Sequence, residues 1–193
     1  MKKRLILVTS PPASGKTFVS QQLAKKLPHV VYLDKDALIP LSKRIFLVAG
    51  EEYNRSSEFF EEHIRNFEYE AILDIAFEAL EYENLVLINA PFTREVRDND
   101  YMINLKTKLA EHNAELVLIW VVTDIEVSHK RMIERNSPRD TWKLANWDAY
   151  VAGRDYSVPS LPALSDCLVK FYNSSNDEFN ESMERISKFL IEE

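Results

Sequence analysis

The residues with the clearest chemical meaning lie near the N-terminus, in the segment SPPASGKT at positions 10–17. This segment matches the phosphate-binding pattern G-x-x-x-x-G-K-[ST] except at Ser10, which stands where the first glycine is usual. A lysine at this place binds the β- and γ-phosphates of a nucleotide, and the hydroxyl that follows it ligates Mg²⁺. We therefore expect Lys16 to bind phosphate and Thr17 to bind the metal.

The backbone of the same loop is expected to supply further donors. Amide groups from Ala13, Ser14, Gly15, Lys16 and Thr17 would point into one concavity at the start of a helix. Unpaired N–H groups and the positive end of the helix dipole favour an anion there. Gly15 allows close approach of the backbone to the ligand because it has no Cβ.

Hydrophobic periodicity predicts the two elements that position this loop. Residues 5–8 are continuously apolar, as in a buried strand, and Val19, Leu23 and Leu27 recur at four-residue spacing, as on one helix face. The alternative is an ordinary strand-to-helix turn with an exposed lysine. The phosphate loop is the better interpretation because the motif lies between a predicted strand and a predicted helix, and Gly15 is one of only three glycines in the chain.

Four further apolar runs predict strands at residues 30–33, 85–88, 115–122 and 167–172, with helical segments between them. The run at 115–122 is the longest, which indicates a central parallel strand covered on both faces. Strands that alternate with helices predict an α/β fold, a three-layer sandwich around a parallel sheet. We expect all 193 residues to form one domain.

The segment 37–84 is longer than a minimal connection between two strands, and we expect a helical insert there that covers the substrate. The predicted buried face of its long helix carries five residues at three- or four-residue spacing: Phe60, Ile64, Phe67, Ala71 and Ile75. Glutamates such as Glu68 lie on the other face and are predicted to be solvated.

Composition narrows the class of protein. No run of eighteen apolar residues occurs, and the single cysteine, Cys167, cannot form an internal disulfide, so we expect a cytoplasmic protein without a membrane span. The net charge of −7 argues against extended nucleic-acid binding. Neither feature predicts an oligomeric state.

Two carboxylates follow the second predicted strand, at Asp34 and Asp36. The carboxyl ends of parallel strands form the ligand-binding edge of an open α/β sheet, so both should face the crevice of the phosphate loop. Asp34 would support Mg²⁺ through water or cap the helix that follows. The sequence alone leaves both roles open.

Three arginines recur every four residues, at Arg131, Arg135 and Arg139. Arginine supplies the fixed fork of donors that suits a phosphoryl group in transfer. The alternative is an exposed basic helix face that pairs with acids such as Glu134. Because a phosphate loop is also present, we expect at least one of the three to bind phosphate.

Together, residues 12–17, the Asp34-Lys35-Asp36 strand end and the arginine series resemble the P-loop kinases of the nucleoside-monophosphate-kinase-like group. This group includes gluconate and shikimate kinases, chloramphenicol phosphotransferase, zeta toxins and polynucleotide kinase domains, alongside AAA-type ATP-binding proteins. The resemblance implies a P-loop NTPase fold with a five-stranded parallel sheet, a mobile lid at about residues 136–146, and ATP and Mg²⁺ as cofactors.

The same resemblance implies roles for single residues. Asp36 matches the aspartate that accepts a proton from the substrate hydroxyl, which requires hydrogen-bonding reach of the attacking oxygen. Arg135 and Arg139 would stabilise the charge of the transition state, and Arg131 would contact the nucleotide. One departure is Asn89, which ends the third strand where many P-loop enzymes have a carboxylate. Metal support would then depend on Thr17 and the pair of aspartates.

The predicted function is ATP-dependent transfer of a γ-phosphoryl group to a hydroxyl or phosphate of a small-molecule acceptor. Two alternatives stay open: a kinase of nucleic-acid ends or nucleotide sugars, and a nucleotide-binding regulatory protein or slow NTPase. Asp36 separates the last of these from a kinase, because a binding module does not need that carboxylate. The sequence identifies neither the acceptor nor a preference for ATP over GTP.

Overall fold

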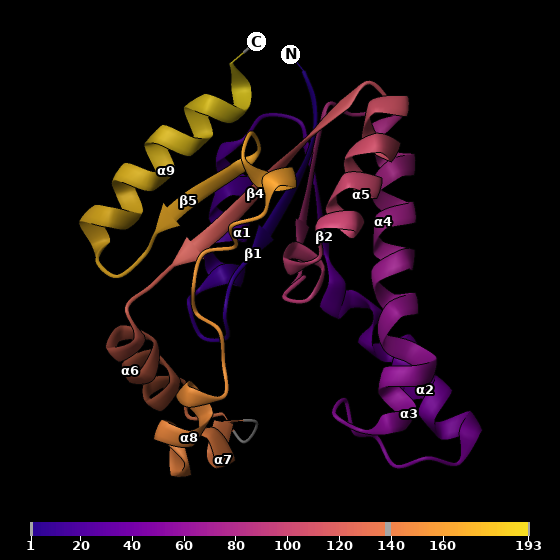
Figure 1. Cartoon of the computed structure of the whole chain (residues 1–193), viewed down its shortest axis with the longest axis vertical. Helices are drawn as coiled ribbons and strands as arrows, with labels where there is room; N and C mark the ends of the chain where they lie inside the picture. Colours follow the sequence, from indigo (N-terminus) through magenta and orange to yellow (C-terminus); the bar gives the residue numbers. More distant parts are fainter. Residues whose placement is uncertain (1, 138–139, 193) are drawn as a thin grey trace.

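A parallel sheet forms the centre of the protein (Figure 1). The computed structural model describes residues 2–137 and 140–192, and in these residues the sheet has five strands in the order β2-β3-β1-β4-β5. The strands are β1 (Lys3–Thr9), β2 (Val30–Asp34), β3 (Leu85–Asn89), β4 (Ala114–Val122) and β5 (Leu168–Tyr172). The predicted five-stranded parallel sheet is confirmed.

The middle strand is β1, which pairs with β3 on one side and β4 on the other. The run at 115–122 was predicted to be a central parallel strand covered on both faces. β4 is an interior parallel strand covered on both faces, but it lies between β1 and β5, one place from the middle. Any interior strand of a parallel sheet is covered on both faces and therefore apolar, so apolarity alone does not distinguish the two places. The position of β1 puts the phosphate loop at the middle of the sheet.

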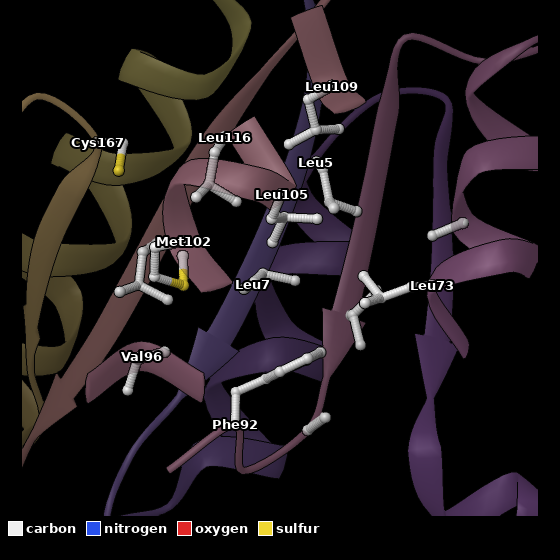
Figure 2. Close-up of a cluster of buried hydrophobic side chains, with 14 of the residues drawn as sticks. Leu5, Leu7, Leu73, Phe92, Val96, Met102, Leu105, Leu109, Leu116 and Cys167 are labelled. Atoms are coloured by element: carbon white, nitrogen blue, oxygen red, sulfur yellow. The ribbon is translucent and has the colours of Figure 1, made fainter. Parts of the chain in front are cut away.

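Helices cover both faces of the sheet. Helices α1 (Lys16–Lys26) and α9 (Asn176–Ile191) pack on one face, where Val19 and Ile186 share a buried apolar cluster. Helices α4 (Asn66–Leu80) and α5 (Asn99–Glu111) pack on the other, and Figure 2 shows Leu73 and Leu105 of these helices beside Leu7 of β1. The predicted three-layer sandwich is confirmed.

Two helical arms extend from the edge of the sheet at which the strands end (Figure 1). The first arm (residues 35–65) follows β2 and contains η1 (Lys35–Leu38), α2 (Ile39–Ala49), α3 (Glu58–Phe60) and the π-helical turn η2 (Glu61–Arg65). The second arm (residues 125–137 and 140–154) follows β4 and contains α6 (Ile125–Arg135), α7 (Thr141–Ala145) and α8 (Trp147–Ala152). Two short 3-10 helices lie elsewhere, at η3 (Glu95–Arg97) and η5 (Pro162–Leu164).

The predicted buried face of the long helix is wrong beyond residue 65. Phe67 is 60% exposed and Ile75 is 43% exposed, whereas Ile72, Ala76 and the charged Glu68 are buried. The cause is the π-helical turn η2, which adds a residue to the helical repeat and moves the buried positions one residue along the chain. Glu68 thereby enters the interior, contrary to the prediction that it is solvated.

Within the described part of the chain, no helix combines the length and apolar character needed to cross a membrane.

Candidate active site

The phosphate loop has the backbone conformation that its glycine suggests. Gly15 has φ of 85° and Ala13 has φ of 67°, both in the left-handed region, and α1 begins at Lys16. A Cβ on Gly15 would lie 2.6 Å from Asn173 Nδ2, so a side chain there would require that amide to move. Ser10 is not among the residues with positive φ, which explains how the loop forms without its first glycine.

Two side chains from neighbouring strand ends hold the loop at a single carbonyl. Ser14 O accepts hydrogen bonds from Thr123 Oγ1 at 2.8 Å and from Asn173 Nδ2 at 2.7 Å. Thr123 follows β4 and Asn173 follows β5. Sequence reasoning missed both residues, although each is a polar residue directly after an apolar strand, the position at which ligand-binding edges form.

Asn89 links the loop lysine to the first aspartate. Lys16 Nζ donates to Asn89 Oδ1, and Asn89 Nδ2 donates to Asp34 Oδ2 at 2.8 Å. Burial lowers the pKa of Lys16 to about 8, although the charges of Asp34 and Asp36 act in the opposite direction. Lys16 is therefore a desolvated cation that gains from an anionic ligand.

Tyr32 is a further member of this network that the sequence did not indicate. Its hydroxyl lies 3.1 Å from Asp34 Oδ2 and 3.2 Å from Asn89 Nδ2. Burial, followed by the charge of Asp34, raises the pKa of Tyr32 to about 12. At neutral pH the phenol is protonated and donates to Asp34, which fixes the orientation of that carboxylate.

Asp34 also caps the helix that follows it. Asp34 Oδ1 accepts from the backbone N–H of Asp36 at 3.0 Å, so the capping role left open by the sequence is present. The second oxygen, Oδ2, faces Asn89. Asp36 is exposed and lines the same cleft as the loop.

The Thr17 hydroxyl and the Asp34 carboxylate are oxygen ligands that suit Mg²⁺ when phosphate oxygens complete its coordination shell. Thr17 Oγ1 lies 3.4 Å from Asn89 Nδ2, which places the hydroxyl near the Asp34 carboxylate. Among the described residues there is no cluster of three His, Cys, Asp or Glu side chains that could hold a metal. Mg²⁺ is commonly bound by one or two protein oxygens together with water and substrate phosphates, and Thr17 and Asp34 fit that pattern.

A cleft of about 630 Å³ brings the predicted groups together. The cleft is lined by the phosphate loop, by Asp34 and Asp36, and by three cations of the second arm that we call the cationic wall: Arg135, Lys143 and Arg154. This volume is in the range of small-molecule sites. Lys143 and Arg154 had no sequence signal of their own, because they reach the cleft only through the fold of the second arm.

The three arginines of the series differ in position. Arg135 lines the cleft, whereas Arg131 lies beside the loop, where its Nη2 donates to Asn173 O at 2.8 Å. Arg131 Nη1 is buried without a hydrogen-bond partner and would lie 3.5 Å from a Cβ on Gly15. Arg139 is outside the described residues.

The strand order, the loop at the end of the middle strand and the carboxylates beside it define a P-loop nucleotide-binding fold. The family model of the AAA domain matches residues 5–155, and the chain belongs to this family. No curated protein is similar enough to count as a match.

Solved structures share the fold over nearly the whole chain. A candidate kinase from Chloroflexus aurantiacus is 22% identical with a TM-score of 0.64, and the match covers 98% of this chain and 97% of that one. Shikimate kinase from Bacteroides thetaiotaomicron is 16% identical with a TM-score of 0.54, over 97% and 98% of the two chains. Kti12 from Chaetomium thermophilum, solved with ADP-AlF3, is 17% identical with a TM-score of 0.54, over 97% and 100%. The suspected resemblance to nucleoside-monophosphate-kinase-like proteins is confirmed at the level of fold.

Proposed function

We propose that the protein is a kinase that transfers the γ-phosphoryl group of ATP to a hydroxyl or phosphate of a small acceptor. The observation that carries the proposal is the shared cleft, in which a phosphate loop, an exposed carboxylate and a cationic wall face one volume. A module that only binds nucleotide has no need for Asp36 in that volume.

Each group has a role in this proposal. Lys16 and the loop amides bind the triphosphate, and Asp36 accepts the proton of the attacking hydroxyl. Arg135 neutralises charge on the phosphoryl group during transfer, with Arg139 assigned to the same task from the sequence alone. Thr17 and Asp34 hold Mg²⁺, which would shield the phosphate charge, and Arg131 supports the nucleotide side of the loop.

We assign the first arm to the acceptor and the second arm to the phosphates of the nucleotide. The first arm contains Asp36 in η1, and we assign the helical insert at 37–84, which follows Asp36, to the acceptor side. The second arm and the 136–146 segment are assigned to a lid over the phosphates. The first assignment rests on the position of the insert directly after Asp36, and the second rests on Arg135, Lys143 and Arg154, which line the cleft. A cytoplasmic location is part of the same proposal.

Nucleotide binding is tested by thermal unfolding. Saturating Mg-ATP is expected to raise the melting temperature by several degrees, because a ligand at 100 times its dissociation constant stabilises a protein by about 2.7 kcal/mol. Lys16→Ala is expected to abolish this shift, whereas Lys25→Ala, a matched change on the exposed side of α1, is expected to retain it. An unchanged melting temperature for the wild type with Mg-ATP would contradict the nucleotide assignment.

Acceptor chemistry is tested with Asp36→Asn. A screen of metabolite hydroxyls, nucleotides, nucleotide sugars and oligonucleotide ends for ATP-dependent phosphorylation would identify the acceptor. Asp36→Asn is then expected to bind Mg-ATP as the wild type does and to lose transfer by about 10²- to 10⁴-fold. Full turnover in this variant would exclude Asp36 as the base.

A nucleotide-binding regulatory protein or slow NTPase is the second candidate. The observation in its favour is Asn89, which adds no charge at the strand end that carries a carboxylate in many P-loop enzymes. Under this candidate no acceptor is phosphorylated, Mg-ATP binds in a Lys16-dependent manner, and Asp36→Asn leaves slow hydrolysis unchanged.

A further inference from the structure

A buried carboxylate lies behind the cationic wall of the cleft. Asp140 has 0% exposure. Its Oδ2 accepts from Arg135 Nε at 3.0 Å and from Arg135 Nη2, and its Oδ1 accepts from Lys143 Nζ at 2.9 Å. Arg135 and Lys143 line the cleft with the phosphate loop, so one acid holds two of the cations that face a ligand.

Asp140 is an anion at neutral pH. Burial opposes its ionisation, but the hydrogen bonds from Lys143 and Arg135 outweigh this effect and hold the pKa of Asp140 below its ordinary value. A buried charge that loses its partners is strongly unfavourable. Arg135 and Lys143 are therefore confined to positions within reach of this carboxylate.

The contacts with Asp140 leave both cations able to bind a ligand. A guanidinium carries five N–H donors in a fixed plane, and Asp140 engages one at Nε and one at Nη2. A lysine ammonium has three donors, and Asp140 engages one of them. The remaining donors are available to an anion in the cleft, while the carboxylate restricts the motion of both side chains.

The rest of the second arm supports this arrangement. Tyr150 is 4% exposed, and its ring lies 5.8 Å from Lys143 Nζ and 5.2 Å from Arg154 Cζ. Trp147 of α8 stacks on His129 of α6 with ring centroids 3.9 Å apart. The cations thus lie on a packed unit with Asp140 and Tyr150 in its interior.

We propose that Asp140 is a positioning residue that holds Arg135 and Lys143 together against the phosphoryl group being transferred. The inference rests on the proposed kinase function. Pre-organised donors avoid the entropic cost of ordering two long, flexible side chains when the ligand binds. The competing explanation is that Asp140 only stabilises the fold of the second arm.

The test compares affinity for two nucleotides that differ at the γ-position. Dissociation constants for the Mg²⁺ complexes of ADP and of the non-hydrolysable analogue AMP-PNP are measured by calorimetry for wild type, Asp140→Asn and the control Asp148→Asn. Asp148 is an exposed acid on α8, so its variant makes the same chemical change without a buried partner. We expect Asp140→Asn to weaken AMP-PNP binding about 10-fold and ADP binding less than 3-fold, because Arg135 and Lys143 are no longer held in place and their charge-assisted hydrogen bonds to the γ-phosphate weaken.

Two kinds of effect of Asp140→Asn would overturn the inference. One is equal weakening of both nucleotides, which indicates a general structural effect. The other is a persistent effect of Asp140→Asn in a background with Arg135→Gln and Lys143→Gln, because a residue that acts through these cations has nothing to position there.

If Asp140→Asn does not fold, the proposal is tested with variants of the two cations. Arg135→Gln, Lys143→Gln and the double variant are compared by the same AMP-PNP measurement. We expect the double variant to differ from the product of the single effects by at least about 3-fold, since both cations depend on one carboxylate, and strict additivity would refute the proposal. A wild type that binds neither nucleotide would overturn the kinase function as well, whereas Lys16-dependent binding with unchanged affinities in Asp140→Asn would overturn this inference alone.

Discussion

The first arm depends on a buried ion network that makes a strong prediction about stability. Glu68 is 4% exposed and accepts from Lys35 Nζ at 2.6 Å and from Arg55 Nη1 and Nη2 at 2.7 and 2.6 Å. Ser42 Oγ also donates to this carboxylate. Lys35 lies between Asp34 and Asp36 in the chain, so Glu68 links α4 to the segment that carries these two aspartates.

Glu68→Ala is expected to lower the free energy of unfolding by about 3–5 kcal/mol, because Lys35 would become a buried cation without a carboxylate. The pKa of Glu68 supports this magnitude of the loss in free energy of unfolding. Burial raises the pKa, but hydrogen bonds from Arg55, Lys35 and Ser42 outweigh burial and lower it from 4.5 to about 2. That difference corresponds to about 3 kcal/mol of interaction with the ionised form.

Chemical denaturation and thermal unfolding both measure this effect. For a chain of this size the loss corresponds to a fall in melting temperature of about 6–20 °C. Glu70→Ala is the matched control, since Glu70 is exposed on the same helix, and it is expected to change stability by less than about 0.5 kcal/mol.

The pH dependence has a definite sign. A depressed carboxyl pKa contributes stability that is fully present above about pH 4.5 and is lost as the pH falls toward 2. The difference between wild type and Glu68→Ala should therefore narrow in acid. A cost below about 1 kcal/mol at pH 7, or a difference that does not narrow between pH 5 and pH 3, would refute the reasoning.

Three further predictions concern the cleft. Because the pKa of Lys16 is about 8, affinity for Mg-ADP should fall as the pH rises above 8. Calorimetry should find a weaker pH dependence of this affinity in Lys16→Arg. An equal pH dependence in wild type and variant would contradict the assignment of Lys16 to phosphate binding. Asn89→Asp replaces a donor to Asp34 by a second carboxylate. We therefore expect the free energy of unfolding to fall by about 1–3 kcal/mol at pH 7 and to recover partly at pH 5. The exposed control Asn104→Asp is expected to show neither effect. Asn173→Ala removes one of two donors to Ser14 O and should weaken Mg-ADP binding about 5- to 10-fold. Asn180→Ala changes an exposed residue and should leave the affinity unchanged. Equal affinities in the two variants would show that Asn173 does not contribute to nucleotide binding.

Strong local signals explain which features the sequence could predict. The apolar runs specified all five strands, because a parallel sheet covered on both faces requires continuous apolarity. The loop motif located Lys16 and Thr17, and the strand-end rule placed Asp34 and Asp36 beside them.

Other features had no local signal. The position of β4 depends on strand order, which periodicity does not encode, and the π-helical turn shifted the buried face of α4 by one residue. Tyr32, Thr123 and Asn173 join the site because separate strands end side by side. Which strand ends lie side by side is determined by the assembled sheet, so no single segment of the sequence predicts these contacts.

The two hydrogen bonds to Ser14 O determine how the phosphate loop meets its ligand. A peptide unit is planar, and its C=O and the following N–H point in opposite directions. Because Thr123 and Asn173 fix the carbonyl of Ser14 toward the ends of β4 and β5, they also fix the amide hydrogen of Gly15 on the opposite side. The amide of Gly15 is thus oriented before any anion arrives, and nucleotide binding should require little rearrangement of this peptide unit.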